Sequence, residues 1–112
     1  MDWGKVVYVF FTLMSLTTAV GFLYHNDPVY LYIATGVNLI STLLKVGVRN
    51  LLAAELLATS LVADLHLIPA FFALQFSENL AAAIALTIGA VVANVVTIAL
   101  FLIESAKTKE EI

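Results

Sequence analysis

Cysteine and charge are scarce in this sequence, and each scarcity excludes a class of protein. The chain of 112 residues has no cysteine, so it is not a small secreted domain held together by disulfides. Only 12% of its residues are charged, against about 25% in an ordinary soluble domain. The five Lys and Arg residues are outnumbered by eight Asp and Glu residues, which gives a net charge of −3. Nucleic acid is therefore not an expected partner.

Catalytic signatures are missing as well. The sequence contains no GxSxG nucleophile elbow, no HExxH zinc motif and no phosphate-binding glycine loop. Its histidines, His25 and His66, do not repeat any metal-ligand spacing. We therefore expect no enzymatic activity, no cofactor and no bound metal.

Long apolar segments are what the sequence does contain. Hydrophobic residues make up 62% of the chain, more than a soluble protein of this length can bury. A membrane-spanning helix needs about 20 mostly apolar residues. The sequence predicts an all-α fold, a four-helix transmembrane bundle with short loops that forms one integral membrane domain over residues 1–112. The helices are expected at about 3–24, 29–48, 51–74 and 79–103, with a cytoplasmic tail at 104–112.

The basic residues predict the orientation of the bundle. With four spans, all the Lys and Arg side chains fall on one side of the membrane: Lys5, Lys45, Arg49, Lys107 and Lys109. Three or five spans would divide them between the two sides. By the positive-inside rule, both termini are expected in the cytoplasm, and the expected location is a bacterial inner membrane.

Polar residues inside the predicted spans indicate a functional layer. Asp64 lies about 15 Å from the outer end of its helix, and Asn38 lies at a similar depth on the preceding helix. Ser41 and Ser60 are close to the same level. A carboxyl group in the middle of a membrane is costly and is a functional-site hypothesis by default. The alternative is that these side chains are hydrogen-bonding contacts between helices.

His66 and Pro69 follow Asp64 closely on the same helix. Proline has no amide proton, so it can kink a helix or leave a carbonyl free. We expect the segment 64–69 to line a pore or an ion site, with His66 controlling access. The alternative is that His66 only lies near the outer membrane surface.

Two further features concern packing. Lys45 and Glu55 are equally distant from the turn near residue 50, which predicts a structural ion pair that closes this hairpin. Ala85, Gly89 and Ala93 recur every four residues on the last helix. Such a ridge of small residues allows close helix packing, either against the first helix or against another copy of the chain in a homo-oligomer.

Residues 38–69, NLISTLLKVGVRNLLAAELLATSLVADLHLIP, resemble small four-helix bacterial membrane proteins of unknown function. The resemblance implies the same fold and brings no activity with it. Small multidrug exporters differ, because they carry a glutamate in their first helix and this chain has none there.

These observations predict a small multi-pass ion channel or transporter for a monovalent cation or protons, acting as a homo-oligomer in the lipid bilayer. Asp64 is the expected coordinating or protonatable group in the ion pathway, with the other members Asn38, Ser41, Ser60 and His66. The alternative is an accessory or structural subunit of a larger membrane complex, without transport of its own.

Overall fold

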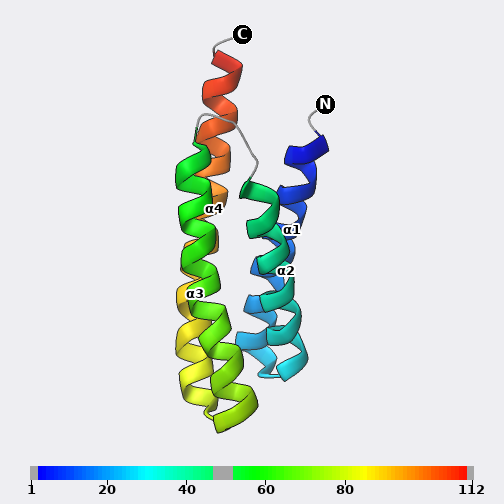
Figure 1. Cartoon of the computed structure of the whole chain (residues 1–112), viewed down its shortest axis with the longest axis vertical. Helices are drawn as coiled ribbons and strands as arrows, with labels where there is room; N and C mark the ends of the chain where they lie inside the picture. Colours follow the sequence, from blue (N-terminus) through cyan, green and yellow to red (C-terminus); the bar gives the residue numbers. More distant parts are fainter. Residues whose placement is uncertain (1–2, 47–51, 111–112) are drawn as a thin grey trace.

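The computed structural model describes residues 3–46 and 52–110 as four helices (Figure 1). They are α1 (Trp3–His25), α2 (Pro28–Val46), α3 (Ala53–Ser77) and α4 (Leu80–Glu110). Each of the four is long and apolar enough to cross a membrane. The chain is thus an integral multi-pass membrane protein, and the predicted all-α fold of four spans is confirmed.

Two tight turns join the helices into antiparallel hairpins. After α1, Asn26 adopts a left-handed conformation with φ of 59°, and its backbone N–H donates to the Phe22 carbonyl at 2.7 Å. After α3, Glu78 does the same with φ of 50°, and its N–H donates to the Ala73 carbonyl. Asn79 then caps α4 by accepting a hydrogen bond from the Ala82 N–H at 3.1 Å. Left-handed residues at helix ends reverse the chain within a few residues, so each pair of helices lies side by side.

The observed helix bounds differ from the predicted ones mainly on the last two helices. Helix α3 runs without interruption through Pro69 and ends at Ser77. Helix α4 continues past 103 to Glu110, so most of the predicted tail is helical. The predicted ends at 47–48 and 51, and residues 111–112, lie outside the described residues.

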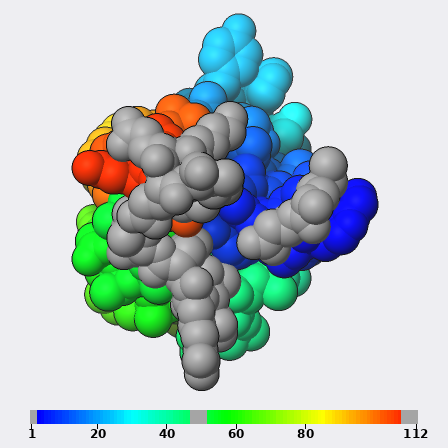
Figure 2. All heavy atoms as spheres, turned by 90° about the horizontal axis from the view of Figure 1, so that it is seen from above, coloured from blue at the N-terminus to red at the C-terminus, as the bar shows by residue number. Residues whose placement is uncertain are grey.

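The four helices form a closed ring in which each one packs against two neighbours, in the order α1, α2, α3, α4. The molecule measures 51 × 20 × 20 Å, and both ends of the chain lie at the same end of the bundle (Figure 1). Figure 2, viewed from that end, shows α1 and α4 next to each other, with α2 and α3 completing the ring. We call this end the terminal end and the opposite one the turn end.

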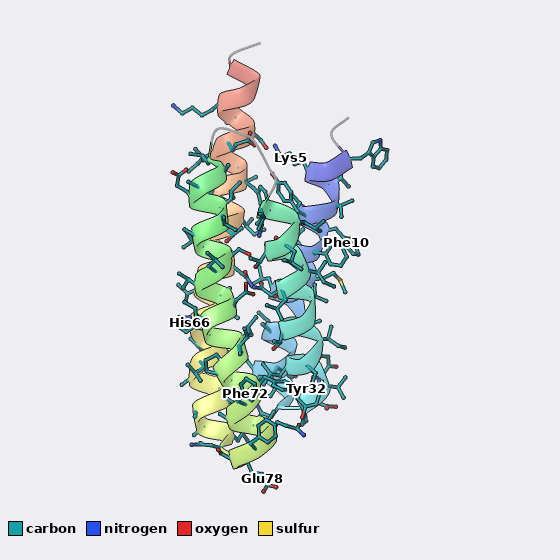
Figure 3. All side chains as sticks on the ribbon, viewed as in Figure 1. Lys5, Phe10, Tyr32, His66, Phe72 and Glu78 are labelled. Carbon is teal, nitrogen blue, oxygen red and sulfur yellow. The ribbon has the colours of Figure 1, made fainter. Side chains whose placement is uncertain are left out.

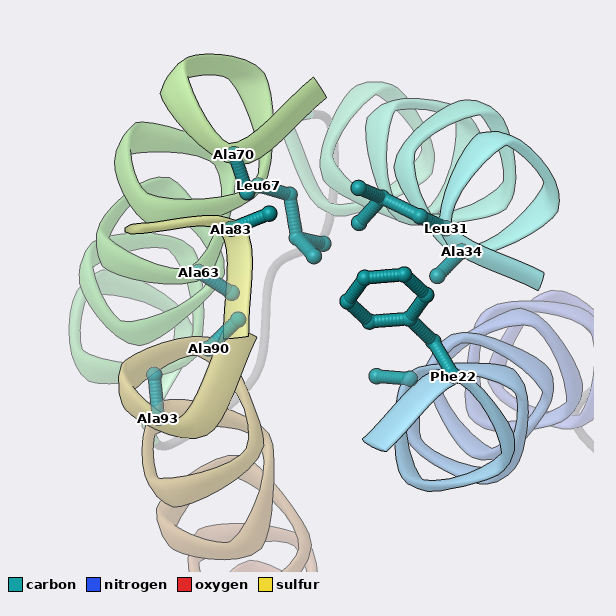
Figure 4. Close-up of a cluster of buried hydrophobic side chains, with 10 residues drawn as sticks. Phe22, Leu31, Ala34, Ala63, Leu67, Ala70, Ala83, Ala90 and Ala93 are labelled. Carbon is teal, nitrogen blue, oxygen red and sulfur yellow. The ribbon is translucent and has the colours of Figure 1, made fainter. Parts of the chain in front are cut away.

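Apolar side chains fill both ends of the bundle interior. Towards the turn end, Phe22, Leu31 and Leu67 are fully buried among alanines (Figure 4). Towards the terminal end, Tyr8, Leu56 and Phe101 form a smaller cluster, in which the Tyr8 and Phe101 rings stack with centroids 4.8 Å apart. We call these the turn-end and terminal-end clusters, and the polar side chains lie between them.

Candidate functional site

A buried polar core connects all four helices at the middle of the bundle. None of its side chains is more than 7% exposed. Its members are Thr12 and Ser15 of α1, Asn38, Ser41, Thr42 and Lys45 of α2, Ser60 and Asp64 of α3, and Asn94 of α4. All four predicted core-facing site residues, Asp64, Asn38, Ser41 and Ser60, are therefore brought together.

Helical periodicity explains why these residues meet. On α2, the positions 38, 41, 42 and 45 follow the three- and four-residue spacing of one helix face. On α3, Ser60 and Asp64 are four residues apart and share the face that points into the bundle. The other polar positions of α3, Thr59 and His66, fall on a different face.

Both carboxylate oxygens of Asp64 accept hydrogen bonds from α2. Asn38 Nδ2 donates to Oδ1 at 2.5 Å, and Thr42 Oγ1 donates to Oδ2 at 2.6 Å. Asn38 Nδ2 also lies 3.5 Å from the Ser60 carbonyl. The carboxyl group is thus held on both sides by groups that can donate.

The hydroxyl groups near Asp64 form an ordered chain that leads to Lys45. Thr42 Oγ1 lies 2.7 Å from Ser60 Oγ, and Lys45 Nζ donates to Ser60 Oγ at 3.3 Å. A threonine hydroxyl has one proton to donate, and the shortest contact of Thr42 is with Asp64. Thr42 Oγ1 also lies 3.0 Å from the Asn38 carbonyl. When the Thr42 proton is on the Asp64 side, the Ser60 hydroxyl can donate to Thr42, and the donors then run from Lys45 towards Asp64.

Lys45 belongs to this core, and the predicted ion pair with Glu55 is wrong. Its Nζ also donates to Thr12 Oγ1 at 2.9 Å and lies 5.8 Å from the centre of the Phe101 ring. Glu55 is exposed on the outside of α3. Equal distance from a turn sets the depth of two residues but not the face of the helix on which each lies. The charge that acts on Lys45 across the core is that of Asp64.

A second branch joins Asp64 to α1 and α4. Asn38 Oδ1 accepts a hydrogen bond from Ser15 Oγ at 2.8 Å, and Ser15 Oγ accepts one from Asn94 Nδ2 at 3.3 Å. Thr12 Oγ1 and Ser41 Oγ are 2.8 Å apart and complete the network next to Lys45. Asn94 Oδ1 is buried and has no hydrogen-bond partner among residues 3–46 and 52–110.

The polar core is closed at both ends. The turn-end cluster covers it on one side and the terminal-end cluster on the other. Two surface grooves, of about 390 and 420 Å³, lie between α2 and α3 and between α3 and α4. No member of the polar core lines either of these grooves. Asp64 is therefore buried, only 6% exposed, and is not on the wall of either groove.

His66 does not share the site of Asp64, in contrast to the prediction for 64–69. Two residues along a helix correspond to a rotation of about 200°, so His66 points to the outer side of α3 (Figure 3). There its Nδ1 lies 2.8 Å from the Val62 carbonyl, and its ring packs over Gly89 of α4. Helix α3 continues through Pro69, so the backbone is not interrupted there, and the expected pore lining at 64–69 stays a prediction.

The small-residue ridge of α4 is used within the chain for part of its length. Gly89 faces His66 of α3, and Ala93 is buried, only 7% exposed. Ala85 is exposed. Close approach at Gly89 and Ala93 therefore serves the contact between α3 and α4.

Three members of the polar core were not among the predicted site residues: Thr12, Thr42 and Asn94. Thr42 lies one turn after Asn38 and Thr12 lies one turn before Ser15, so helical spacing could have identified both. Asn94 carries no such signal, because its only polar neighbour in the core is on another helix. Within the described ranges, no three His, Asp or Glu side chains are grouped closely enough to hold a metal ion.

Comparison with known proteins places the chain in a family but not in a functional class. Residues 25–105 match a family of unknown function, DUF6394. This range contains all of α2 and α3 and most of α4, together with the α2 and α3 residues that surround Asp64. No curated protein and no solved structure matches the chain.

Proposed function

Because the chain belongs to the family of unknown function DUF6394, we propose a function from its own residues: it is a small membrane transport protein that moves protons. The observation that carries this proposal is the ordered chain of hydrogen bonds from Lys45 through Ser60 and Thr42 to Asp64. Two side chains that can exchange a proton stand at its ends, and hydroxyl groups that can relay one stand between them.

The proton step needs no movement of heavy atoms. The Lys45 ammonium releases a proton to Ser60 Oγ, Ser60 passes its own hydroxyl proton to Thr42, and Thr42 passes its own to Asp64 Oδ2. The products are a neutral amine and a neutral carboxylic acid, and the two hydroxyl groups are restored. Two opposite charges inside a membrane are neutralised together, which lowers the free energy of burying the two side chains.

A proton fits this site better than a metal cation. A bare cation needs a shell of oxygen ligands, but the Lys45 ammonium already occupies the hydroxyl oxygens of Thr12 and Ser60. Its positive charge also repels a second cation. Neither of the two grooves reaches Asp64, whereas a proton can move along hydrogen bonds without a cavity.

Passage across the whole membrane requires a motion of the bundle. The turn-end cluster separates Asp64 from one side, and the stacked rings of Tyr8 and Phe101 cover Lys45 from the other. In this proposal the structure is the closed form, and each cluster opens in turn to give the polar core access to water. The predicted homo-oligomer stays a prediction, since the hydrogen-bonded chain lies within one copy.

We place the protein in a bacterial cytoplasmic membrane with its terminal end in the cytoplasm. Lys5 near the start of α1, Lys45 near the end of α2 and Lys107 in α4 all lie towards this end. An excess of Lys and Arg on one side supports a cytoplasmic position of that side.

Proton flux into liposomes tests the proposal. The purified chain is reconstituted into vesicles that contain a pH-sensitive dye, and a potassium gradient with valinomycin supplies the driving voltage. We expect proton uptake with the unmodified chain and an at least tenfold slower rate with Asp64→Asn or Ser60→Ala, because each removes one step of the relay. Thr18→Ala is the matched control, since Thr18 donates only to carbonyls of its own helix.

Equal uptake by the unmodified chain, Asp64→Asn and protein-free vesicles would contradict the proposal. A flux that depends on sodium or potassium and is insensitive to pH would point to a metal cation instead.

The closure of the polar core favours a second candidate function. Asp64 accepts hydrogen bonds from Asn38 and Thr42 of α2, and apolar clusters lie at both ends of the polar core. A structural subunit of a larger membrane complex would use such a core only to fix the positions of its helices. Copurification with one membrane partner at a constant ratio, together with no proton flux, would support this alternative.

A further inference from the structure

The groove between α3 and α4 combines mostly apolar walls with two polar side chains, Thr59 and His66. It has a volume of about 420 Å³, and Val62, Val92 and Val96 contribute to its walls. His66 and Gly89 lie in it next to each other. His66 is about 16 Å along α3 from the end of the helix at Ser77, which places the imidazole near the middle of the membrane.

The hydrogen bonding of His66 leaves an acceptor in this groove. Its Nδ1 lies 2.8 Å from the Val62 carbonyl, and a carbonyl only accepts, so Nδ1 carries the proton. In the neutral ring, Nε2 is then an acceptor. Nothing in the described part of the chain donates to it. An acceptor without a partner is costly in the hydrocarbon region, where there is no water to satisfy it.

Neither phospholipid nor a second copy of the chain supplies the missing donor. Acyl chains have no polar hydrogen, and ester carbonyls only accept. In a two-fold contact at this groove, His66 of each copy would present the same acceptor to the other. The exposed hydroxyl groups of Thr17 and Thr18 already donate to carbonyls of α1, and that of Thr59 donates within α3. A ligand that brings its own hydroxyl group into the middle of the membrane would satisfy this acceptor.

We propose that this groove binds a lipid-soluble quinol, with one phenolic hydroxyl donating to His66 Nε2 and the tail lying along the valines. Sterols and diacylglycerol also carry a hydroxyl, but it stays at the membrane surface, whereas a quinol ring dissolves deeper in the bilayer. Gly89 is essential to the geometry: a Cβ at this position would lie 2.3 Å from His66 Cδ2 and 2.7 Å from Nε2. Any larger residue would force the imidazole to turn.

This proposal is independent of the proton relay. His66 and Asp64 are two residues apart, so they lie on different faces of α3, and no hydrogen bond in the described residues connects them. The variant Asp64→Asn should therefore leave quinol binding unchanged, so each proposal can fail without the other.

Equilibrium binding of a short-chain quinol tests the site. The chain is placed in lipid nanodiscs under argon, and the quinol is compared with its dimethyl ether, which has the same ring without a donor. We expect the quinol to bind about tenfold more weakly to His66→Leu than to the unmodified chain, and the ether to bind weakly to both. His25→Leu is the matched control, since it removes the other histidine, at the turn end.

Gly89→Ala gives a second test that keeps the imidazole but displaces it. Its quinol affinity should fall while the helix content seen by circular dichroism is retained. Equal affinity for quinol and ether, or equal affinity of the unmodified chain and both variants, would overturn the proposal. Stronger binding of diacylglycerol than of quinol would overturn it as well.

Discussion

Asp64 and Lys45 are the two ionisable side chains buried in the middle of the bundle, and each lowers the cost of burying the other. They are not in direct contact, but Ser60 and Thr42 connect them, and their charges interact across the core. Removal of one charge leaves the other unpaired in the buried core, which is usually more harmful than removal of both.

A double-mutant cycle on this pair should show strong coupling. We expect Asp64→Asn and Lys45→Met each to lower the free energy of unfolding by about 3 kcal/mol, because each strands a buried charge. The double variant should lose less than the sum of the two, by at least about 1 kcal/mol. Unfolding in mixed detergent micelles measures all four proteins. Simple additivity would show that the two charges do not interact.

The sequence was sufficient to find four members of this site but not their hydrogen-bond partners. Asp64, Asn38, Ser41 and Ser60 could be predicted because depth and helical spacing follow directly from residue numbers. The rotation of α3 relative to α2 cannot be obtained in this way, so Lys45 was assigned to Glu55. That rotation depends on how all four helices pack, which a single sequence does not reveal.

At the scale of elements, the hydrophobic pattern was enough to predict the four helices. It gave the end of the last apolar segment, which is not the end of the last helix. The last apolar segment stops at Glu104, but α4 continues to Glu110 because residues after the membrane can stay helical. Pro69 was expected to interrupt α3, but the helix tolerates it. Neighbouring helices can support a proline inside a membrane segment, and sequence alone does not show them.

An ion pair joins the first and last elements near the terminal end. Lys5 Nζ lies 2.9 Å from Glu104 Oε2, and it also donates to Ser105 Oγ at 2.5 Å. We expect Glu104→Lys to lower the free energy of unfolding by about 1 kcal/mol through repulsion. The swapped pair Lys5→Glu with Glu104→Lys should regain part of this loss. Thermal unfolding in detergent measures both, and no recovery in the swapped protein would show that the contact between α1 and α4 does not depend on this pair.

At the scale of the whole molecule, the turn-end cluster is the larger of the two apolar clusters inside the bundle. Phe22 is fully buried in the turn-end cluster (Figure 4). Phe22→Ala should lower the free energy of unfolding by about 3–5 kcal/mol, because it leaves a cavity. Leu43→Ala, on the exposed surface, is the control and should change stability much less. A small loss for Phe22→Ala would indicate that the helices collapse into the space.

The lack of cysteine makes the orientation of the whole molecule easy to measure. Ser77→Cys introduces one thiol at the turn end, and Ala106→Cys introduces one at the terminal end. In intact bacterial cells, an impermeant maleimide should label only Ser77→Cys. The turn end and the terminal end of the bundle lie on opposite sides of the membrane, and the proposed orientation places the terminal end in the cytoplasm. Labelling of both positions, or of Ala106→Cys alone, would contradict the proposed orientation.

Helix α4 acts as a single rigid rod between the aqueous phase and the interior. It has 31 residues, so it is about 46 Å long, and its C-terminal turns rise above the rest of the bundle (Figure 1). The same rod carries Asn94, which holds Ser15 and through it the second branch of the network. A partner that binds the projecting turns and tilts or rotates α4 would thereby move Asn94 inside the membrane. Binding outside the bilayer would then change the buried hydrogen bonds.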